Sequence, residues 1–253
     1  MKRCNVNIML FNEVESLQGV VDGFLGLRGR VDEDLRIVII DDGSTDGSSE
    51  VASALAGESG EGGERGDVEI IRVVHHEKNM GLGEVYRTGF REAQRDLADY
   101  VTFFPADGQF EPELIIRYLR RMGEADLVLG YLEGGRPGIV GRGLSFVERF
   151  TYKLLFGGFP RFHGIMMFRG RLLDEISLVS RGRGWGNVME FVLKASRRGY
   201  RISTVEITVK PRRYGRSKVN NLRSICANAI QLGELRMALW KEERVNRRDS
   251  GGR

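Results

Sequence analysis

The run RIVII at residues 36–40 constrains the fold of this chain more than any other stretch. Four consecutive β-branched side chains leave no polar face, which is typical of a strand buried on both sides in a parallel sheet. The run ends abruptly in the sequence DDGSTDGS. Its Asp, Gly and Ser residues favour a turn and a helix N-cap. A buried strand followed at once by a helix predicts a βα unit.

The same alternation recurs along the first half of the chain. This spacing predicts a doubly wound, mostly parallel α/β sheet. Ligands of such sheets bind beyond the carboxyl ends of the strands. The polar residues at 12–13, 41–42 and 107–109 each follow a strand, so we expect them to converge on one crevice. Strands are expected at 5–11, 36–40, 68–75, 100–104 and 126–129, and helices at 14–27, 47–55, 82–97 and 112–122.

The pattern changes after residue 130, but no linker separates an independent domain. The chain is therefore expected to form one domain over residues 1–240, followed by a basic tail at 241–253. The low-complexity stretch at 57–66 predicts a mobile surface loop. In the second half we expect a Gly/Arg-rich loop at 134–143, an apolar segment at 165–168, a strand at 201–209, and helices at 144–156, 187–198 and 219–240.

Charge is distributed unevenly along the chain. The first 100 residues hold 11 basic and 20 acidic side chains, whereas residues 201–253 hold 13 and 5. This asymmetry predicts a cation or polar ligand near the front and an anionic partner later. A nucleic-acid partner is excluded, because the acidic front would repel phosphates and no DNA-binding motif occurs.

Targeting signals and cysteine motifs are not evident. No apolar run is long enough for a transmembrane helix, and the N-terminus turns polar too soon for a signal peptide. Cys4 and Cys226 form no CxxC pattern. A cytoplasmic, reduced protein without a structural zinc site is expected.

Two oxygen-bearing side chains, Asp107 and Gln109, follow the strand expected at 100–104. Both could reach a hard cation such as Mg²⁺, which prefers oxygen ligands and completes its shell with phosphate oxygens and water. Asp107 and Gly108 would equally suit a β-turn that binds nothing. Their place at a strand end, beside the other polar clusters, favours the metal.

Two further clusters are open to structural and functional interpretations. Asp41 and Asp42 could cap the next helix or accept hydrogen bonds from a nucleobase or ribose. The loop KPRRYGRSK at 210–218 concentrates arginines that could bind phosphate, or it is a solvated basic loop. Structural or solvent-facing roles are expected for the histidines, which lack ligand spacing: His75, His76 and His163.

Five segments, in this order, resemble glycosyltransferase family 2, specifically its dolichol-phosphate mannosyltransferase-like branch. The resemblance covers about residues 5–220. Pro105, Leu132 and Pro160 depart from it, standing where the family has Asp, Arg and Asp. The segments are MLFNE (P-x-Y-N-E), IVIIDDGSTDGS (V-D-D-G-S-x-D-G-S), KNMG with Gly89 (N-x-G…G), VTFFPADGQFEP (V-x-x-M-D-A-D-x-Q-x-x-P) and EITVKPRRYGRSK (E-V-P-I-x-F-x-x-R-x-x-G-x-S-K).

The resemblance implies a GT-A fold with a nucleotide-sugar half at about 1–130 and an acceptor half, extended by helices, at about 131–240. It implies metal-dependent, inverting transfer from a GDP-mannose or UDP-glucose type of donor to a polyprenyl or dolichyl phosphate, with Mg²⁺ or Mn²⁺. Asp107, Arg212 and Lys218 would be catalytic, and Asp107 and Gln109 would hold the metal. Donor contacts would come from Phe11, Asn12, Glu13, Asp41, Asp42, Lys78, Asp107 and Gln109, and acceptor-phosphate contacts from Arg142, Ser145, Arg212, Ser217 and Lys218.

A phosphate acceptor is already ionised near neutral pH. The transfer of a sugar to it therefore needs no strong general base. One alternative is a soluble hydroxyl acceptor, for which Glu190 is the candidate base, unless it is an ordinary charge near a helix start. Another is a non-catalytic nucleotide-sugar-binding subunit of a membrane complex. A lipid acceptor predicts attachment to the cytoplasmic face of a membrane, directly or through an anchored subunit. Apolar residues at 144–168 and 219–240 could lie on that surface or pack internally.

Overall fold

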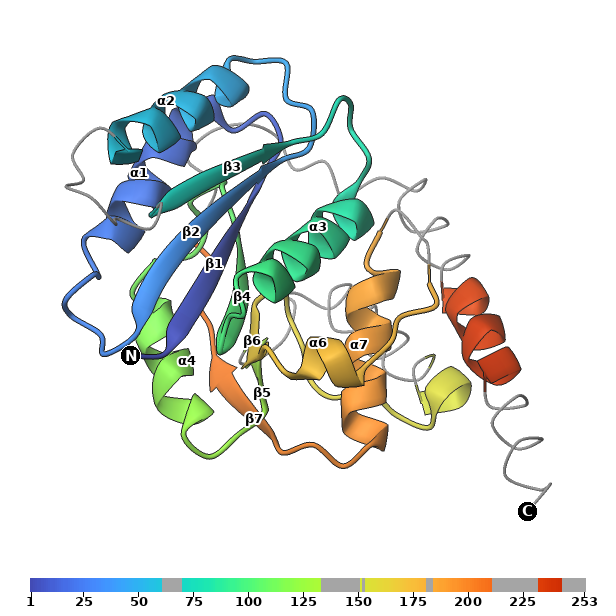
Figure 1. Ribbon diagram of the computed structural model, residues 1–253. Coiled ribbons are helices and arrows are strands. Elements are labelled where there is room, and N and C mark those ends of the chain that lie inside the picture. The colour runs from blue at the N-terminus through green and yellow to red at the C-terminus, as the bar shows by residue number, and fades with distance from the viewer. Residues whose placement is uncertain (61–69, 133–150, 152, 181–183, 211–231, 243–253) are drawn as a thin grey trace.

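The computed structural model describes residues 1–60, 70–132, 151, 153–180, 184–210 and 232–242 (Figure 1). Seven strands form one sheet in the order β3-β2-β1-β4-β6-β5-β7. Only β6 runs antiparallel to its neighbours β4 and β5. The predicted mostly parallel α/β sheet is confirmed. The strands are β1 (Arg3–Leu10), β2 (Asp34–Asp41), β3 (Ile71–His75), β4 (Tyr100–Pro105), β5 (Leu127–Tyr131), β6 (Met166–Arg169) and β7 (Ile202–Glu206).

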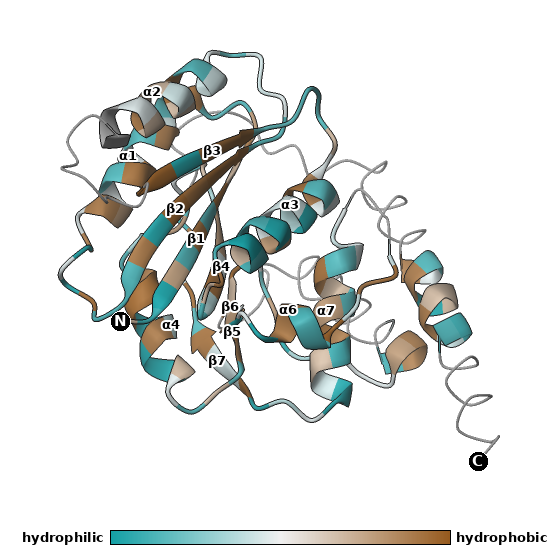
Figure 2. Cartoon of the chain, in the orientation of Figure 1, coloured by the Kyte–Doolittle hydropathy of each residue, from teal (hydrophilic) through white to brown (hydrophobic). Residues whose placement is uncertain are grey.

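Helices cover both faces of this sheet. The predicted burial of residues 36–40 on both faces is confirmed. Ile37 and Ile39 belong to the core on one face of the sheet, and Val38 and Ile40 belong to the core on the other. The outer surface of the helix α3 (Leu82–Arg95) is hydrophilic (Figure 2). The first face packs against α1 (Val14–Leu25), α2 (Ser48–Gly60) and α4 (Leu114–Met122), and the second against α3 (Leu82–Arg95), α6 (Leu172–Glu175) and α7 (Gly186–Arg197).

Several element boundaries differ from the sequence expectation. Residues 57–60, expected to belong to a loop, are helical, because α2 continues through Gly60 from the good helix formers Ala54, Leu55 and Ala56. Residues 61–69 lie outside the described part of the chain. The short helix α6 was not predicted, since four residues carry no helical periodicity. The strand predicted at 201–209 is shorter and ends at Glu206.

The C-terminal half is described in part. Residues 153–156 and 232–242 are helical, which agrees with the ends of two predicted helices. Leu235 and Leu239 pack with Phe156, and with Met189 and Leu193 of α7, in a third apolar cluster. This cluster attaches the C-terminal helix to the body of the domain. The loop predicted at 134–143 and most of the helices predicted at 144–156 and 219–240 lie outside the described residues.

Candidate active site

Four strand ends meet at one edge of the sheet. β1 and β4 are parallel neighbours. After β1 the chain continues to β2 on one flank of this pair, and after β4 it continues to β5 on the other flank, so the topological switch point lies between them. The segments that follow β1, β2, β3 and β4 start at residues 11, 42, 76 and 106. These are the polar clusters expected to converge, together with one more after β3.

A pocket of about 410 Å³ opens between the segments that follow β1, β2 and β3. One aromatic ring, several hydroxyl groups, two imidazoles and a lysine line it. That mixture of one ring face with many hydrogen-bonding groups suits a polar, planar ligand such as a nucleoside. The lining residues are Phe11, Asp41, Gly43, Ser44, Thr45, Ser49, His75, His76, Glu77, Lys78 and Asn79.

Asp41 lies at the base of the pocket, where its side chain is nearly inaccessible to solvent. Its Oδ1 accepts a hydrogen bond from the Ser44 backbone N–H at 3.0 Å. Its Oδ2 accepts one from the Ser49 hydroxyl and lies 2.9 Å from Nδ1 of His75. Burial would raise the pKa of Asp41, but the hydrogen bonds from Ser44, Ser49 and His75 outweigh it and hold the pKa below its ordinary value.

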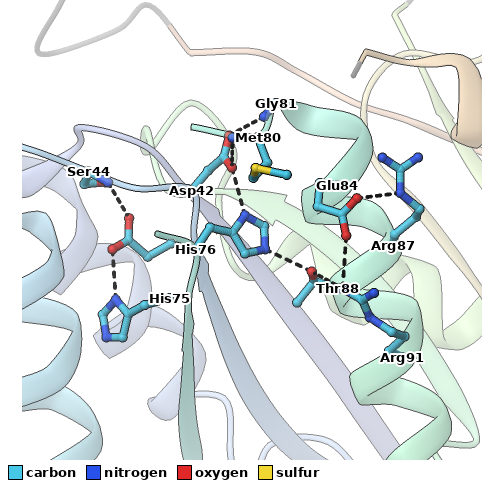
Figure 3. Close-up of polar contacts among 11 residues, drawn as sticks. Asp42, Ser44, His75, His76, Met80, Gly81, Glu84, Arg87, Thr88 and Arg91 are labelled. Carbon is cyan, nitrogen blue, oxygen red and sulfur yellow. Dashed lines mark hydrogen bonds and ion pairs between the residues drawn. The ribbon is translucent and has the colours of Figure 1, made fainter. Parts of the chain in front are cut away.

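Asp42 is not among the residues that line the pocket, and its carboxylate closes the loop after β3 (Figure 3). Its Oδ1 lies 2.8 Å from Nδ1 of His76 and also accepts the Met80 backbone N–H at 2.8 Å. Its Oδ2 accepts the Gly81 backbone N–H at 2.9 Å. One carboxylate therefore binds both ends of the 76–81 loop.

Gly43 lets the loops after β2 and β3 approach each other. Its φ is +70°, and a Cβ there would lie 2.5 Å from the carbonyl carbon of Lys78 and 2.7 Å from N of Asn79. Both are backbone atoms that cannot rotate away. A glycine is thus required where the pocket wall passes this closely.

The loops after β1 and β2 are also joined to each other. Asn12 has a φ of +54°, and its backbone N–H donates to Ser44 Oγ at 2.9 Å. The side-chain Oδ1 of Asn12 accepts a hydrogen bond from the Thr45 backbone N–H at 2.8 Å. The backbone N–H of Glu13 donates to Ser48 Oγ at 3.0 Å. Asn12 and Glu13 therefore do not line the pocket but connect two of the loops that form its wall.

Asp107 and Gln109 form a tight turn directly after β4. The Gln109 backbone N–H donates to Asp107 Oδ1 at 3.1 Å, and Gly108 between them has a φ of +66°. The side-chain Nε2 of Gln109 donates to the carbonyl of Lys210 at 3.1 Å, and the Lys210 N–H donates to the carbonyl of Gln109 at 2.9 Å. Asp107 and Gly108 thus form a turn, and this turn is tied to Lys210, the first residue of the predicted basic loop.

The same turn carries a donor set that fits a substrate-borne cation. Among the described residues, no group of three or more His, Cys, Asp or Glu side chains could hold a metal by itself. Asp107 and Gln109 offer one carboxylate and one amide oxygen. Mg²⁺ commonly binds through one or two such oxygens and takes its other ligands from substrate phosphates and water.

Residues 6–170 match the family model described as "Glycosyl transferase family 2". That span runs from β1 through β6 and includes all four strand ends at the pocket edge. The chain belongs to glycosyl transferase family 2. It is a glycosyltransferase, and its sheet with helices on both faces is the GT-A fold that the resemblance implied.

Relatives of this family 2 enzyme cover most of its length. It is 28% identical to the undecaprenyl-phosphate mannosyltransferase of Micrococcus luteus, over 84% of this chain and 86% of that one. It is 27% identical to the polyprenol monophosphomannose synthase of Mycolicibacterium smegmatis, over 92% and 87%. A solved glucosyl-3-phosphoglycerate synthase from Mycobacterium tuberculosis, in complex with Mn²⁺, UDP and phosphoglyceric acid, has the same fold, with a TM-score of 0.64, 20% identity, and coverage of 92% and 79%.

Of the donor residues expected from the sequence, Phe11, Asp41 and Lys78 line the pocket of this family 2 enzyme. Asn12 and Glu13 join loops, as described above. Asp107 and Gln109 lie at the end of β4, outside the pocket lining. Asp42, also expected to contact the donor, is not among the pocket-lining residues: consecutive residues of an extended chain point in opposite directions, and its carboxylate holds the 76–81 loop. Outside the described residues lie Arg142, Ser145, Arg212, Ser217 and Lys218.

His75 is the main residue that sequence reasoning missed. It was expected to be structural or solvent-facing; its side chain is indeed 42% exposed, but it also pairs with Asp41 and lines the pocket, which was not foreseen. The signal lies in the pairing of β2 with β3, whose register places His75 directly opposite Asp41. The remaining unpredicted lining residues are Gly43, Ser44, Thr45, Ser49, His76, Glu77 and Asn79.

Glu190, the candidate base for a soluble acceptor, is fully buried in α7. Its carboxylate accepts the backbone N–H groups of Val179 and Ser180, both at 2.8 Å, and forms an ion pair with Lys194 at 2.8 Å. A carboxylate held by three donors in the protein interior is a structural group. The geometry disfavours its use as a general base on an acceptor.

Proposed function

We propose that this enzyme transfers a sugar, mannose in the first instance, from a nucleotide-diphosphate sugar to a polyprenyl phosphate. The observation that supports this most is the similarity, over 84–92% of the chain, to two enzymes named for mannose transfer to polyprenyl phosphates. The site agrees with it, because a nucleoside-sized pocket lies at the same sheet edge as a turn that suits a diphosphate-bound cation.

The pocket residues would hold the donor. Phe11 offers a ring face to the base, the hydroxyls of Ser44 and Thr45 offer hydrogen bonds, and Lys78 offers a positive charge to the diphosphate. Asp107 and Gln109 would hold Mg²⁺ or Mn²⁺, and structural neighbours are crystallised with either ion and UDP. Such an ion offsets the charge that accumulates on a leaving diphosphate.

The acceptor phosphate would approach from the side of the basic loop. An ionised phosphate oxygen is itself a nucleophile, which fits a site where the candidate base Glu190 is held in a buried ion pair. Arg212 follows Lys210, which is hydrogen-bonded to Gln109, by two positions in the chain. We assign acceptor-phosphate binding to Arg142, Ser145, Arg212, Ser217 and Lys218, with Arg212 and Lys218 catalytic beside Asp107.

The experiment supplies labelled GDP-mannose or UDP-glucose with Mn²⁺, and offers either a detergent-solubilised polyprenyl phosphate or 3-phosphoglycerate. We expect label in the organic phase only with the lipid acceptor, and a strong reduction when the cation is chelated. Label that stays in the aqueous phase as a new glycoside would favour the soluble-acceptor alternative. Tight nucleotide-sugar binding with no product would favour a non-catalytic subunit.

A lipid acceptor also requires contact with a membrane. None of the helices in the described part of the chain is suited to crossing a bilayer. The C-terminal helix turns Leu235 and Leu239 inward but exposes Met237 and Trp240; Leu154, two residues before Phe156 of the same apolar cluster, is exposed as well. We propose that these three side chains touch the cytoplasmic face of a membrane, where the basic tail would add attraction to anionic lipid.

Sedimentation with anionic liposomes tests this contact. The double variant Met237→Ser/Trp240→Ser should lose most of its binding. Leu97→Ser, at an exposed apolar residue just after α3, should bind as the wild type does. Equal binding by both variants would contradict the assignment and favour an anchored partner subunit.

A further inference from the structure

The 76–81 loop carries four of the pocket-lining residues: His76 at its tied start, and Glu77, Lys78 and Asn79 between its two tied ends. Its start is held by the His76 backbone N–H, which donates to the carbonyl of Asp41 at 2.8 Å. Its finish is held by the Met80 and Gly81 N–H groups on Asp42. Lys78 therefore lies at the apex of a loop that one carboxylate closes.

His76 is the side chain that completes this closure. Its imidazole is only 10% exposed, its Nδ1 lies 2.8 Å from Asp42 Oδ1, and its Nε2 lies 2.9 Å from Thr88 Oγ1 in α3. An ionised carboxylate only accepts, so Nδ1 carries the proton. In the neutral ring, Nε2 then accepts a hydrogen bond from the Thr88 hydroxyl. The oxygen of that hydroxyl in turn accepts a hydrogen bond from the guanidinium of Arg91 at 2.9 Å (Figure 3).

The hydrogen bonds at the two ring nitrogens, called here the Nδ1 arm and the Nε2 arm, have separate consequences. The Nδ1 arm joins the start of the loop to the carboxylate that also binds its end. The Nε2 arm joins the loop to a buried position on α3, which packs on the sheet. The first arm determines the shape of the loop around Lys78, and the second contributes mainly to stability.

We infer that His76 is a positioning residue of the donor site: through Asp42 it fixes the loop that presents Lys78 to the donor diphosphate. The inference rests on the proposed donor site and assigns the second aspartate of the DDGS sequence to loop closure. Asp41 and Asp42 thus have different tasks: both partner histidines line the pocket, but His75 is 42% exposed and His76 only 10%.

Two substitutions separate the arms. The amide nitrogen of Asn can replace Nδ1 of a histidine, so His76→Asn retains the bond to Asp42 and loses Thr88. The amide of Gln reaches the position of Nε2, so His76→Gln retains Thr88 and loses Asp42. Each variant loses one buried hydrogen bond, and a matched fall in melting temperature is expected. Thr88→Val removes the same arm as His76→Asn from the other side.

The experiment measures GDP and UDP binding by calorimetry in Mn²⁺, alongside melting temperature, for the full chain. For the nucleotide that binds the wild type, we expect His76→Gln to raise Kd about tenfold. His76→Asn and Thr88→Val should stay within about threefold. In a double-mutant cycle, His76→Gln should add little to Lys78→Met, because both act on the same contact.

The inference is overturned if His76→Asn and His76→Gln weaken nucleotide binding equally, in step with their melting temperatures, or if His76→Gln and Lys78→Met add fully. A wild type that binds neither GDP nor UDP overturns the donor site itself, and this inference with it. The two failures are therefore distinguishable in one set of titrations.

Discussion

Gln109 and Lys210, 101 positions apart in the chain, exchange two hydrogen bonds: Gln109 Nε2 donates to the Lys210 carbonyl at 3.1 Å, and the Lys210 N–H donates to the Gln109 carbonyl at 2.9 Å. Lys210 also forms an ion pair with Glu111. The turn of Asp107 and Gln109 is thereby joined to Lys210, the first residue of the predicted basic loop. In the proposed function, this pair would link the donor side of the site to the acceptor side.

Gln109→Glu should weaken the acceptor side selectively. The substitution keeps an oxygen for the cation but replaces the Nε2 donor by an acceptor that repels the Lys210 carbonyl. We expect the KM for polyprenyl phosphate to rise about tenfold, with the Kd for the donor changing by less than about threefold. Lys210→Met, which keeps both backbone groups, is the control. A loss confined to donor affinity would contradict the link.

Gly43→Ala should damage the pocket more than its backbone angle alone explains. Gly43 and Gly29 both have positive φ, at +70° and +82°, but a Cβ at Gly29 meets nothing within 4 Å. Gly29→Ala should therefore cost about 1 kcal/mol of unfolding free energy from conformation alone. Gly43→Ala should cost at least about 2 kcal/mol more, because its Cβ collides with backbone.

Nucleotide titrations and denaturant unfolding of these two variants check the prediction. Gly43→Ala should also lose most nucleotide binding, since the Lys78–Asn79 backbone has to move. Equal stability and equal binding in the two alanine variants would show that the close approach is unimportant.

Asp126 should stabilise the fold at neutral pH without affecting transfer. It lies just before β5, at the opposite end of the sheet from the pocket. Burial would raise the pKa of Asp126, but hydrogen bonds from Arg201 and Arg171 lower it to about 2. A lowered folded-state pKa means that the stabilisation is fully present above the unfolded-state pKa and lost as the pH falls from about 4 toward 2.

Asp126→Asn should lower the free energy of unfolding at pH 7 by about 1–2 kcal/mol, a value reduced by the exposure of its arginine partners. Unfolding measured from pH 7 to pH 2 should show the difference from the wild type shrinking below pH 4. A constant difference across this range would mean that ionisation of Asp126 contributes nothing.

Glu190→Gln should lower stability rather than abolish transfer. The amide would place an N–H group against the backbone donors of Val179 or Ser180 and would break a buried ion pair with Lys194. Because Lys194 keeps Glu242 at 2.7 Å, we expect a loss of about 2–3 kcal/mol. Complete loss of transfer in a variant that is folded by circular dichroism would revive Glu190 as a general base.

The sheet and its polar edge could be predicted because the signals are local. The consecutive β-branched residues of the run at 36–40 are themselves typical of a strand buried on both faces, and DDGS follows them directly. The partner of Asp41 could not be predicted the same way. His75 reaches it through the register of two strands separated by a helix and by residues 61–69, and nothing near His75 in the sequence shows that pairing.

Asp42 shows a different limit. In the sequence, the carboxylate beside Asp41 is an equal candidate for binding the ligand, but strand geometry allows only one of two neighbours to face the pocket. Which of them turns inward depends on the 76–81 loop, and that loop acquires its shape only by binding Asp42. The orientation of Asp42 and the shape of the loop thus depend on each other, although Asp42 and Met80 are 38 positions apart in the chain.

The most direct test of the account is the rate at which label from a nucleotide-diphosphate sugar enters polyprenyl phosphate in the presence of Mn²⁺, compared between the wild type and Asp107→Ala. We predict lipid-linked sugar from the wild type and at least a hundredfold lower rate, about 2.7 kcal/mol, from the variant with unchanged melting temperature. No lipid-linked product from a wild type that binds its donor, or full activity of Asp107→Ala, would contradict it.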